Sequence, residues 1–240
     1  MAHPLGSSGG TESGPTFAVV QEDVFSRRLA DRIDEEHAEP GSRTGGLGRR
    51  PTVKEAFEAS AECVIVPVGR PGPGLLLEAD RLAYATGTPW FPIVQDGLVI
   101  RVGPLVRPPF APCFRCAARR QVQHDEKFAA THLLHDAYDA DAGLGLGGCL
   151  PHHLTMTAGL AVDLLRRHGA HSGSAVAEQA SGVVELNLIT NSVIANQVIA
   201  CFDCDRCARP GPALRTAVPE SVLRVLRQRG GADVFTGNAS

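Results

Sequence analysis

The stretch Cys63-Val64-Ile65-Val66-Pro67-Val68 decides the fold class of this 240-residue chain. It is a continuous apolar run of the kind found in strands that are buried on both faces of a parallel sheet. Before it, residues 16–20 (TFAVV) predict a short buried strand, and apolar side chains at helical spacing follow over 23–33. After it, a helix is expected over 75–86, ended by Gly87. This alternation of strands and helices predicts an α/β fold.

Later segments predict antiparallel strands. Residues 90–102 predict a hairpin around Asp96-Gly97, a pair that readily forms a type I′ turn. Two further adjacent strands are expected at 183–190 and 193–200, and the alternating apolar residues of the first predict one solvent-facing side. We therefore expect a mixed sheet with helices on its faces.

The composition divides the chain into three parts. Residues 1–15 are rich in Gly, Ser and Pro and are expected to be a disordered lead-in. Residues 16–210 carry the patterns of one α/β domain, and residues 211–240 are expected to form a C-terminal helix and tail. The remaining helices are expected at 51–60, 124–138, 151–168 and 219–228.

Composition and charge exclude several classes of protein. Hydrophobic residues make up 43% of the chain and charged residues 20%, which is ordinary for a globular protein. No apolar run approaches the roughly 18 residues of a membrane span, and no signal-peptide core is visible near the N-terminus. A net charge of −3 gives no general attraction to nucleic acid or anionic membranes. We expect a cytoplasmic protein that binds neither.

Seven cysteines in such a protein argue for metal ligation or free thiols rather than disulfides. Four of them form two C-x2-C pairs, Cys113-Phe-Arg-Cys116 and Cys204-Asp-Arg-Cys207. Two such turns supply the tetrahedral thiolate set that zinc prefers. Four thiolates leave no open coordination position, so the predicted zinc site is structural and does not activate water.

The other three cysteines suit a packing role better. Cys201 extends the second pair to C-x2-C-x2-C, the start of a bacterial iron–sulfur ligand run, but no fourth cysteine follows it. Iron–sulfur ligation is therefore the alternative at this point, and packing at a strand end is the expectation for Cys201. Cys63 begins a buried strand, and Cys149 lies in a Gly-rich loop without a neighbour that would activate its thiol.

The histidines do not predict a catalytic site. His152 and His153 precede the long helix, and adjacent residues do not face one site on a helix, so a capping or exposed pair is expected. His132 and His135 have the spacing of a metal site with nearby carboxylates, but without a fourth partner a solvated helix face is expected. Local spacing assembles no Ser/His/Asp or Cys/His group.

The sequence around the first cysteine pair resembles the zinc segment of the ThiF-like, ubiquitin-activating-type family. There an extended Gly-Pro segment, here GPLV at 103–106, runs into a Pro-Cys-aromatic-Arg-Cys knuckle, here PCFRC at 112–116, with a second C-x2-C pair far downstream. Over 16–210 the chain is most similar to the ThiF-like partners of YcaO enzymes. Those partners also share a long helix, an L-x-L-x-T strand and a final cysteine pair, met here at 151–168, 186–190 and 204–207.

The chain departs from adenylating members of that family after the first strand. Those members carry a Gly-rich loop whose backbone N–H groups hold phosphates at a helix N-terminus. Here the turn contains no glycine, and Glu22 and Asp23 would repel a triphosphate. Only Lys54 and Lys127 are lysines, and neither matches the phosphate-contacting position. ATP binding is therefore not expected.

The resemblance implies a Rossmann-related, ThiF-like mixed sheet with a four-cysteine zinc knuckle. It also implies that this chain is a non-catalytic docking partner of a YcaO-type cyclodehydratase. Enzymes of that type take part in making azole- and azoline-containing peptides of the thiopeptide and bacteriocin type. The chain would hold the complex together and help to present the precursor peptide. Only about 15 residues precede the domain, so a separate protein is expected to supply leader-peptide binding. ThiF-like folds commonly pair, so a homodimer is expected.

Two other functions stay open at this point. The first is an ATP-dependent adenylyltransferase of the ThiF type that acts on a small carrier protein or peptide, which requires the phosphate loop that this sequence lacks. The second is a zinc-stabilised α/β oligomerisation module without a link to peptide maturation.

Overall fold

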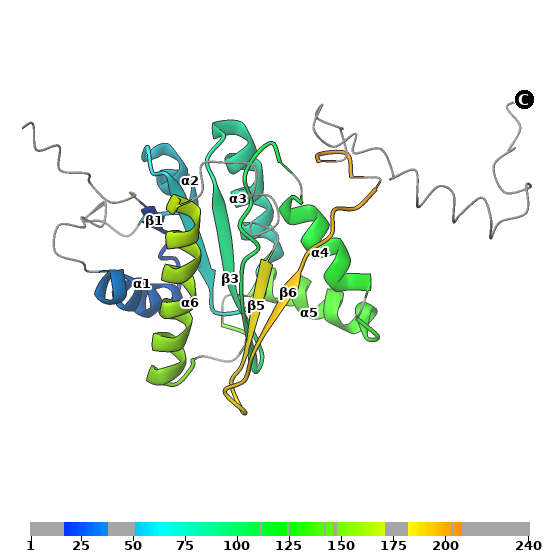
Figure 1. The fold of residues 1–240 in the computed structure, drawn as a ribbon. Helices are drawn as coiled ribbons and strands as arrows, with labels where there is room; N and C mark the ends of the chain where they lie inside the picture. Colours follow the sequence, from blue (N-terminus) through cyan, green and yellow to red (C-terminus); the bar gives the residue numbers. More distant parts are fainter. Residues whose placement is uncertain are drawn as a thin grey trace, which may run out of the picture.

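The computed structural model describes residues 17–37 and 51–207, apart from 111, 124, 142, 146–147, 171–181 and 203. Within this part of the chain, six strands form one sheet in the order β1-β2-β3-β4-β5-β6 (Figure 1). The strands are β1 (Phe17–Val19), β2 (Cys63–Val68), β3 (Trp90–Asp96), β4 (Val99–Val102), β5 (Gly182–Asn187) and β6 (Val193–Gln197). The helices are α1 (Val24–His37), α2 (Val53–Glu58), α3 (Pro73–Thr86), α4 (Phe114–Gln123), α5 (Phe128–Ala140) and α6 (Pro151–Ala170).

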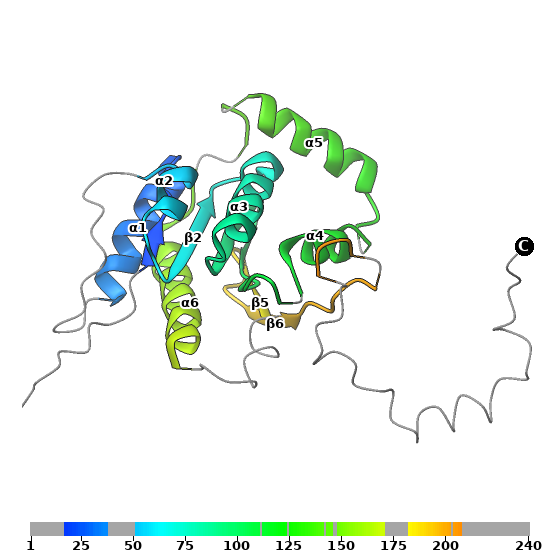
Figure 2. The same ribbon diagram turned by 90° about the horizontal axis from the view of Figure 1, so that it is seen from above.

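The first three strands are parallel, and the last three add to them in antiparallel fashion. Every residue of β2 is buried, as the unbroken apolar run predicts. Alternate side chains of the sheet enter two cores, one against α1 and α6 and the other against α2 and α3 (Figure 2). The expected α/β fold with a mixed sheet and helices on its faces is therefore confirmed.

The turn between β3 and β4 differs in type from the expected one. Asp96 pairs with Val99, so Gly97 and Leu98 are the two central residues. Gly97 has φ +58°, whereas Leu98 is not among the residues with positive φ. A type I′ turn needs positive φ at both positions, and type II′ needs it at the first alone. The Asp-Gly pair marks the turn correctly but lies one position too early for type I′.

Helix α4 is the element that sequence patterning misses. It begins at Phe114, inside the first cysteine pair, where the sequence predicts a C-x2-C turn. Cys116 is its only buried residue, and its few apolar residues stand among three arginines and two glutamines, so no helix was expected here. The helix expected over 124–138 is α5, which begins at Phe128. The two helices together continue the chain away from the cysteine pair.

Several expectations fall outside the described residues. These are the lead-in 1–15, both boundaries of the domain 16–210, and the tail 211–240 with its helix at 219–228. In the part of the chain that the structure describes, no helix is both long and apolar enough to span a membrane.

Candidate functional site

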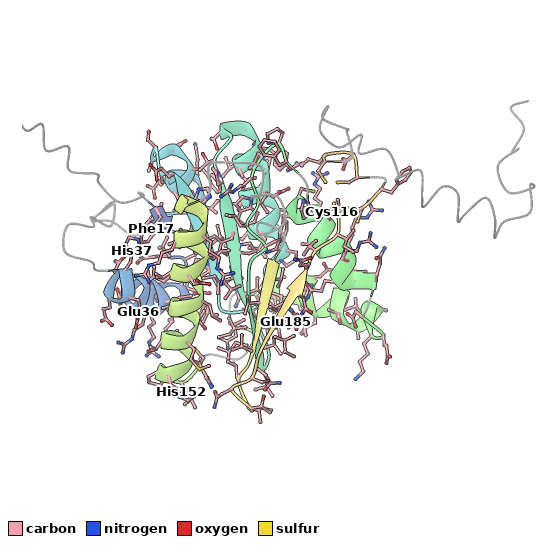
Figure 3. The ribbon with its side chains drawn as sticks, in the orientation of Figure 1. Phe17, Glu36, His37, Cys116, His152 and Glu185 are labelled. Carbon is pink, nitrogen blue, oxygen red and sulfur yellow. The ribbon has the colours of Figure 1, made fainter. Side chains whose placement is uncertain are left out.

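The two C-x2-C pairs meet at one end of the molecule, beside α3 and α4. Cys116 lies in the first turn of α4 (Figure 3), and Cys113 immediately precedes that helix. Cys204 and Cys207 lie in the segment that follows β6. All four side chains are buried. Residues separated by about 90 positions are thus brought together, because β5 and β6 return the chain along the sheet to the start of α4.

The distances between the four sulfur atoms fit a zinc ion. Any two of these Sγ atoms lie within 4.8 Å of each other. The distance is 3.8 Å for Cys113 and Cys116, 3.5 Å for Cys113 and Cys204, and 3.3 Å for Cys116 and Cys207. Zn–S bonds of about 2.3 Å in a tetrahedron separate their sulfurs by about 3.8 Å. Among the described residues this is the one group of three or more His, Cys, Asp or Glu with ligand atoms so close together.

Backbone N–H groups favour a thiolate at Cys204, whereas burial raises the pKa values of the Cys113 and Cys207 thiols. Burial opposes ionisation of Cys204, but backbone hydrogen bonds from Cys207 and Arg206 lower the pKa of the Cys204 thiol to about 7. The backbone N–H of Cys201 donates to Sγ of Cys116 at 3.2 Å. Cys201 is buried beside the four cysteines but does not belong to their group. Its main chain supports a ligand, which agrees with a packing role for its side chain.

The buried carboxylate of Asp80 on α3 contacts an arginine from each of the two cysteine pairs. Each pair carries an arginine before its second cysteine, and both arginines turn toward Asp80, whose side chain is 1% exposed. Arg206 donates to Oδ2 of Asp80 and lies over the Tyr84 ring, with 4.4 Å between the guanidinium carbon and the ring centroid. Nε of Arg115 lies 3.8 Å from the same oxygen, and its Nη1 donates to Asp205. Asp80 therefore ties both pairs to one helix.

Sequence reasoning does not find this network. The two arginines are visible between the cysteines, but Asp80 is one carboxylate of many. Only the docking of α3 against both pairs identifies it as their common partner.

At the carboxyl end of β1, the chain itself fills the N-terminus of α1. The Asp23 carboxylate accepts the backbone N–H of Ser26 at 2.6 Å and that of Gly69 at 2.8 Å. The Ser26 hydroxyl accepts the N–H of Asp23 in return. Glu22 accepts the N–H of Val53 at 3.4 Å. One N–H at the start of α1, that of Ser26, is a donor of the kind that holds phosphate in a Gly-rich loop, and it is bound here by a carboxylate of the same chain.

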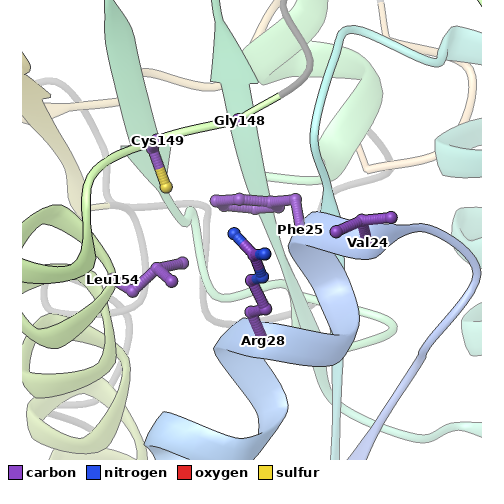
Figure 4. A pocket seen from close by; sticks show the side chains of 6 residues that line it. All are labelled: Val24, Phe25, Arg28, Gly148, Cys149 and Leu154. Carbon is purple, nitrogen blue, oxygen red and sulfur yellow. The ribbon is translucent and has the colours of Figure 1, made fainter.

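The segment between α5 and α6 lies against the sheet at the same end. The buried side chain of Gln95 donates to the carbonyl of Gly148 at 3.2 Å, and Arg70 donates to the carbonyl of Leu144 at 3.0 Å. A small pocket remains between this segment and α1, with Arg28 pointing toward Cys149 (Figure 4). Burial raises the pKa of the Cys149 thiol, and Arg28 opposes that shift. Because burial has the larger effect, the thiolate form of Cys149 is disfavoured despite the nearby Arg28, which the sequence does not predict.

The histidines that the structure describes are not gathered into a site. His132 pairs with Asp136 at 3.2 Å on an exposed face of α5, as expected. His153 differs from the expected exposed pair, because its side chain is buried against His152, with ring centroids 4.0 Å apart. Lys54 forms an exposed pair with Glu58 at 3.8 Å.

Comparison with known proteins supports the fold. No family model and no curated protein matches the chain. Among solved structures, the heterocyclase TruD is similar with a TM-score of 0.55 and 19% identity, over 82% of this chain and 28% of that chain. The E. coli microcin synthetase McbBCD complex contains a similar chain, with a TM-score of 0.58 and 13% identity, over 83% of this chain and 71% of that one. E. coli MccB with ATP has a TM-score of 0.50 and 9% identity, over 82% and 68%.

At sequence identities this low, the structural similarity shows a common fold and carries no further assignment. The chain spans about a quarter of the length of TruD and of a second heterocyclase, which was solved with substrate and cofactor. The expected ThiF-like fold is confirmed, and four clustered, buried cysteines accompany it.

Proposed function

We propose that this chain is a non-catalytic, ThiF-like docking partner of a YcaO-type cyclodehydratase that forms azolines in ribosomal peptides. The partner enzyme would use ATP to activate peptide amides and convert Cys, Ser or Thr residues into azoline rings. This chain would hold the complex together and present the precursor peptide in the cytoplasm. The similarity of its fold to TruD and to a chain of the McbBCD complex supports this assignment.

One observation carries the non-catalytic part of the proposal, namely the Asp23 carboxylate at the start of α1. It accepts two backbone N–H groups, one from α1 and one from Gly69 after β2. A triphosphate would have to displace this carboxylate from both donors and would meet its negative charge, with Glu22 adjacent. No glycine of the turn allows close backbone approach. The geometry therefore favours a ThiF-like domain that does not bind ATP at this point.

The four cysteines have a structural role in this proposal. One zinc ion would be held by four thiolates and would cross-link α4 to the segment after β6. The ligands would be Cys113, Cys116, Cys204 and Cys207. A complete set of thiolate ligands leaves no position for water or substrate. The metal would therefore fix the end of the domain rather than take part in the reaction.

Reconstitution with the partner tests the proposal. A YcaO-type enzyme encoded beside this chain is expected to co-purify with it, and a Cys/Ser/Thr-rich precursor should lose one water mass per ring only when both proteins are present. Unchanged ring formation without this chain would contradict the docking role.

A separate measurement tests the alternative adenylyltransferase. ATP–pyrophosphate exchange by this chain with candidate peptides or carrier proteins should stay at background. The variant Asp23→Asn removes the charge and one of the two acceptor oxygens that bind the N–H groups of Ser26 and Gly69. It adds no glycine to the turn, so it should not create exchange. Exchange by the unmodified chain would contradict the non-catalytic role and favour the adenylyltransferase.

A further inference from the structure

Tyr84 places a buried hydroxyl beside the four clustered cysteines. It lies on α3, one turn after Asp80, and its side chain packs against the cysteines. The hydroxyl oxygen is buried, yet it has no hydrogen-bond partner in the part of the chain that the structure describes. A buried hydroxyl without a partner is costly, because it loses the hydrogen bonds to water that it makes in the unfolded chain. An acceptor for this hydroxyl is therefore expected close by.

Two negative groups near the hydroxyl are candidate acceptors. Burial raises the pKa of the Tyr84 hydroxyl most, and the charges of Cys113 and Asp80 raise it further, in that order. Oδ2 of Asp80 already accepts from Arg206. Oδ1 of Asp80 and the Tyr84 hydroxyl do not meet although both lie on α3, since neither atom has a partner among the described residues. The sulfur of Cys113 is therefore the better acceptor.

The four sulfurs are surrounded by hydrogen-bond donors. Four thiolates carry more negative charge than one Zn²⁺ neutralises, so a buried site of this kind needs donors around its sulfurs. Each of the four sulfurs accepts at least one backbone N–H group, and the donors belong to Cys113, Cys116, Cys201, Arg206 and Cys207. The Tyr84 hydroxyl would add a side-chain donor to this set.

We infer that the Tyr84 hydroxyl donates a hydrogen bond to the zinc-bound thiolate of Cys113 and is a positioning residue for that ligand. The inference rests on the proposed zinc site and adds to it a residue outside the two cysteine pairs. Arg206 makes the hydroxyl a stronger donor, because its guanidinium lies over the Tyr84 ring and draws on the ring electrons. A thiolate held in this way should leave the metal less readily.

Removal of the hydroxyl alone tests the inference on the full, zinc-loaded chain. Tyr84→Phe keeps the ring under Arg206, so the packing and the cation–π contact remain. Zinc release to a chelator should become about tenfold faster, since loss of a hydrogen bond to a metal ligand weakens metal binding by about 10–100-fold. The matched control is Tyr138→Phe, which changes the other tyrosine of the chain, on α5 and outside the group packed against the cysteines. It should release zinc at the unmodified rate.

Metal substitution provides a readout that a packing role does not change. In the cobalt-substituted chain, the sulfur-to-cobalt charge-transfer band depends on the energy of the sulfur lone pairs, which a hydrogen bond lowers. Tyr84→Phe should therefore shift this band to longer wavelength, and Tyr138→Phe should not. In the unmodified chain loaded with an NMR-active cadmium isotope, the hydroxyl proton of Tyr84 should show scalar coupling to the metal through the sulfur of Cys113.

Two results would overturn the inference and leave the zinc site standing. One is a zinc-loaded Tyr84→Phe chain with the unmodified release rate and an unshifted cobalt band. The other is a less stable Tyr84→Phe chain with an unshifted band, which assigns the hydroxyl to Asp80 or to a buried water. If Tyr84→Phe does not fold, the cadmium coupling in the unmodified chain decides, and its absence overturns the inference. An unmodified chain that binds no zinc contradicts the zinc site itself, and the inference with it.

Discussion

Removal of the Asp80 carboxylate should destabilise the chain strongly. Asp80 is buried and accepts from Arg206, which is itself mostly buried under the Tyr84 ring. Asp80→Ala leaves that guanidinium without its counter-charge in a poorly hydrated place. Loss of one partner of a buried ion pair costs about 3–5 kcal/mol. The partly exposed Arg115, 3.8 Å away, is screened by water and adds little.

We therefore expect Asp80→Ala to lower the free energy of unfolding by about 3 kcal/mol, which is a factor of about 100 in the folding equilibrium. Asp80→Asn keeps the volume and one acceptor oxygen, so a smaller loss of about 1.5 kcal/mol is expected. Both variants should also release zinc to a chelator faster, because Arg115 and Arg206 lie between the proposed ligands. Urea unfolding and a colorimetric chelator measure the two effects.

The matched control lies on the same helix. Glu78 pairs with Arg81 at 2.6 Å, but both side chains are exposed to solvent. Glu78→Gln removes a carboxylate–arginine pair without uncovering a buried charge, so it should change neither stability nor zinc release. If Asp80→Ala behaves like Glu78→Gln in both assays, the reasoning about a buried anchor is refuted.

Three further predictions concern the metal, pH and packing. Elemental analysis of the purified chain should find about one zinc, lost in Cys113→Ser with a lower melting temperature, whereas iron with visible absorbance would contradict the site. Burial lowers the pKa of His168 below its ordinary 6.5, so near this pH the unfolded state binds a proton that the folded state does not. The free energy of unfolding should therefore fall as pH drops from 7.5 through 6.5. His168→Gln should show a smaller fall in thermal melts, and an equal fall would contradict this cause. At Gly69 an added Cβ would lie 2.8 Å from Cβ of Phe25, so Gly69→Ala should lower the free energy of unfolding in urea by about 1–3 kcal/mol. Gly148 has open space around it, so the control Gly148→Ala should not lower this free energy. Equal stability of the two variants would count against the close approach at Gly69.

Much of the fold follows from local sequence patterns. The apolar run at Cys63–Val68 is the central buried strand β2, because a segment without polar positions has no face that can meet water. The turn residue Gly97 marks the hairpin for the same local reason, although the type of turn depends on strand register. Helix α4 was not expected, since its few apolar residues stand among three arginines and two glutamines and Cys116 alone of its residues is buried.

The sequence by itself determined the α/β class and the identity of the four clustered cysteines, because strand burial and C-x2-C spacing are properties of neighbouring residues. Tertiary structure alone decided that Asp80 joins both cysteine pairs, that Asp23 caps α1 and binds Gly69, and that β6 lies last in the sheet of the described strands. Each of these features depends on segments tens of residues apart, or on which strand lies last in the sheet. Contacts of that kind are set by how the elements pack, and no local pattern encodes them.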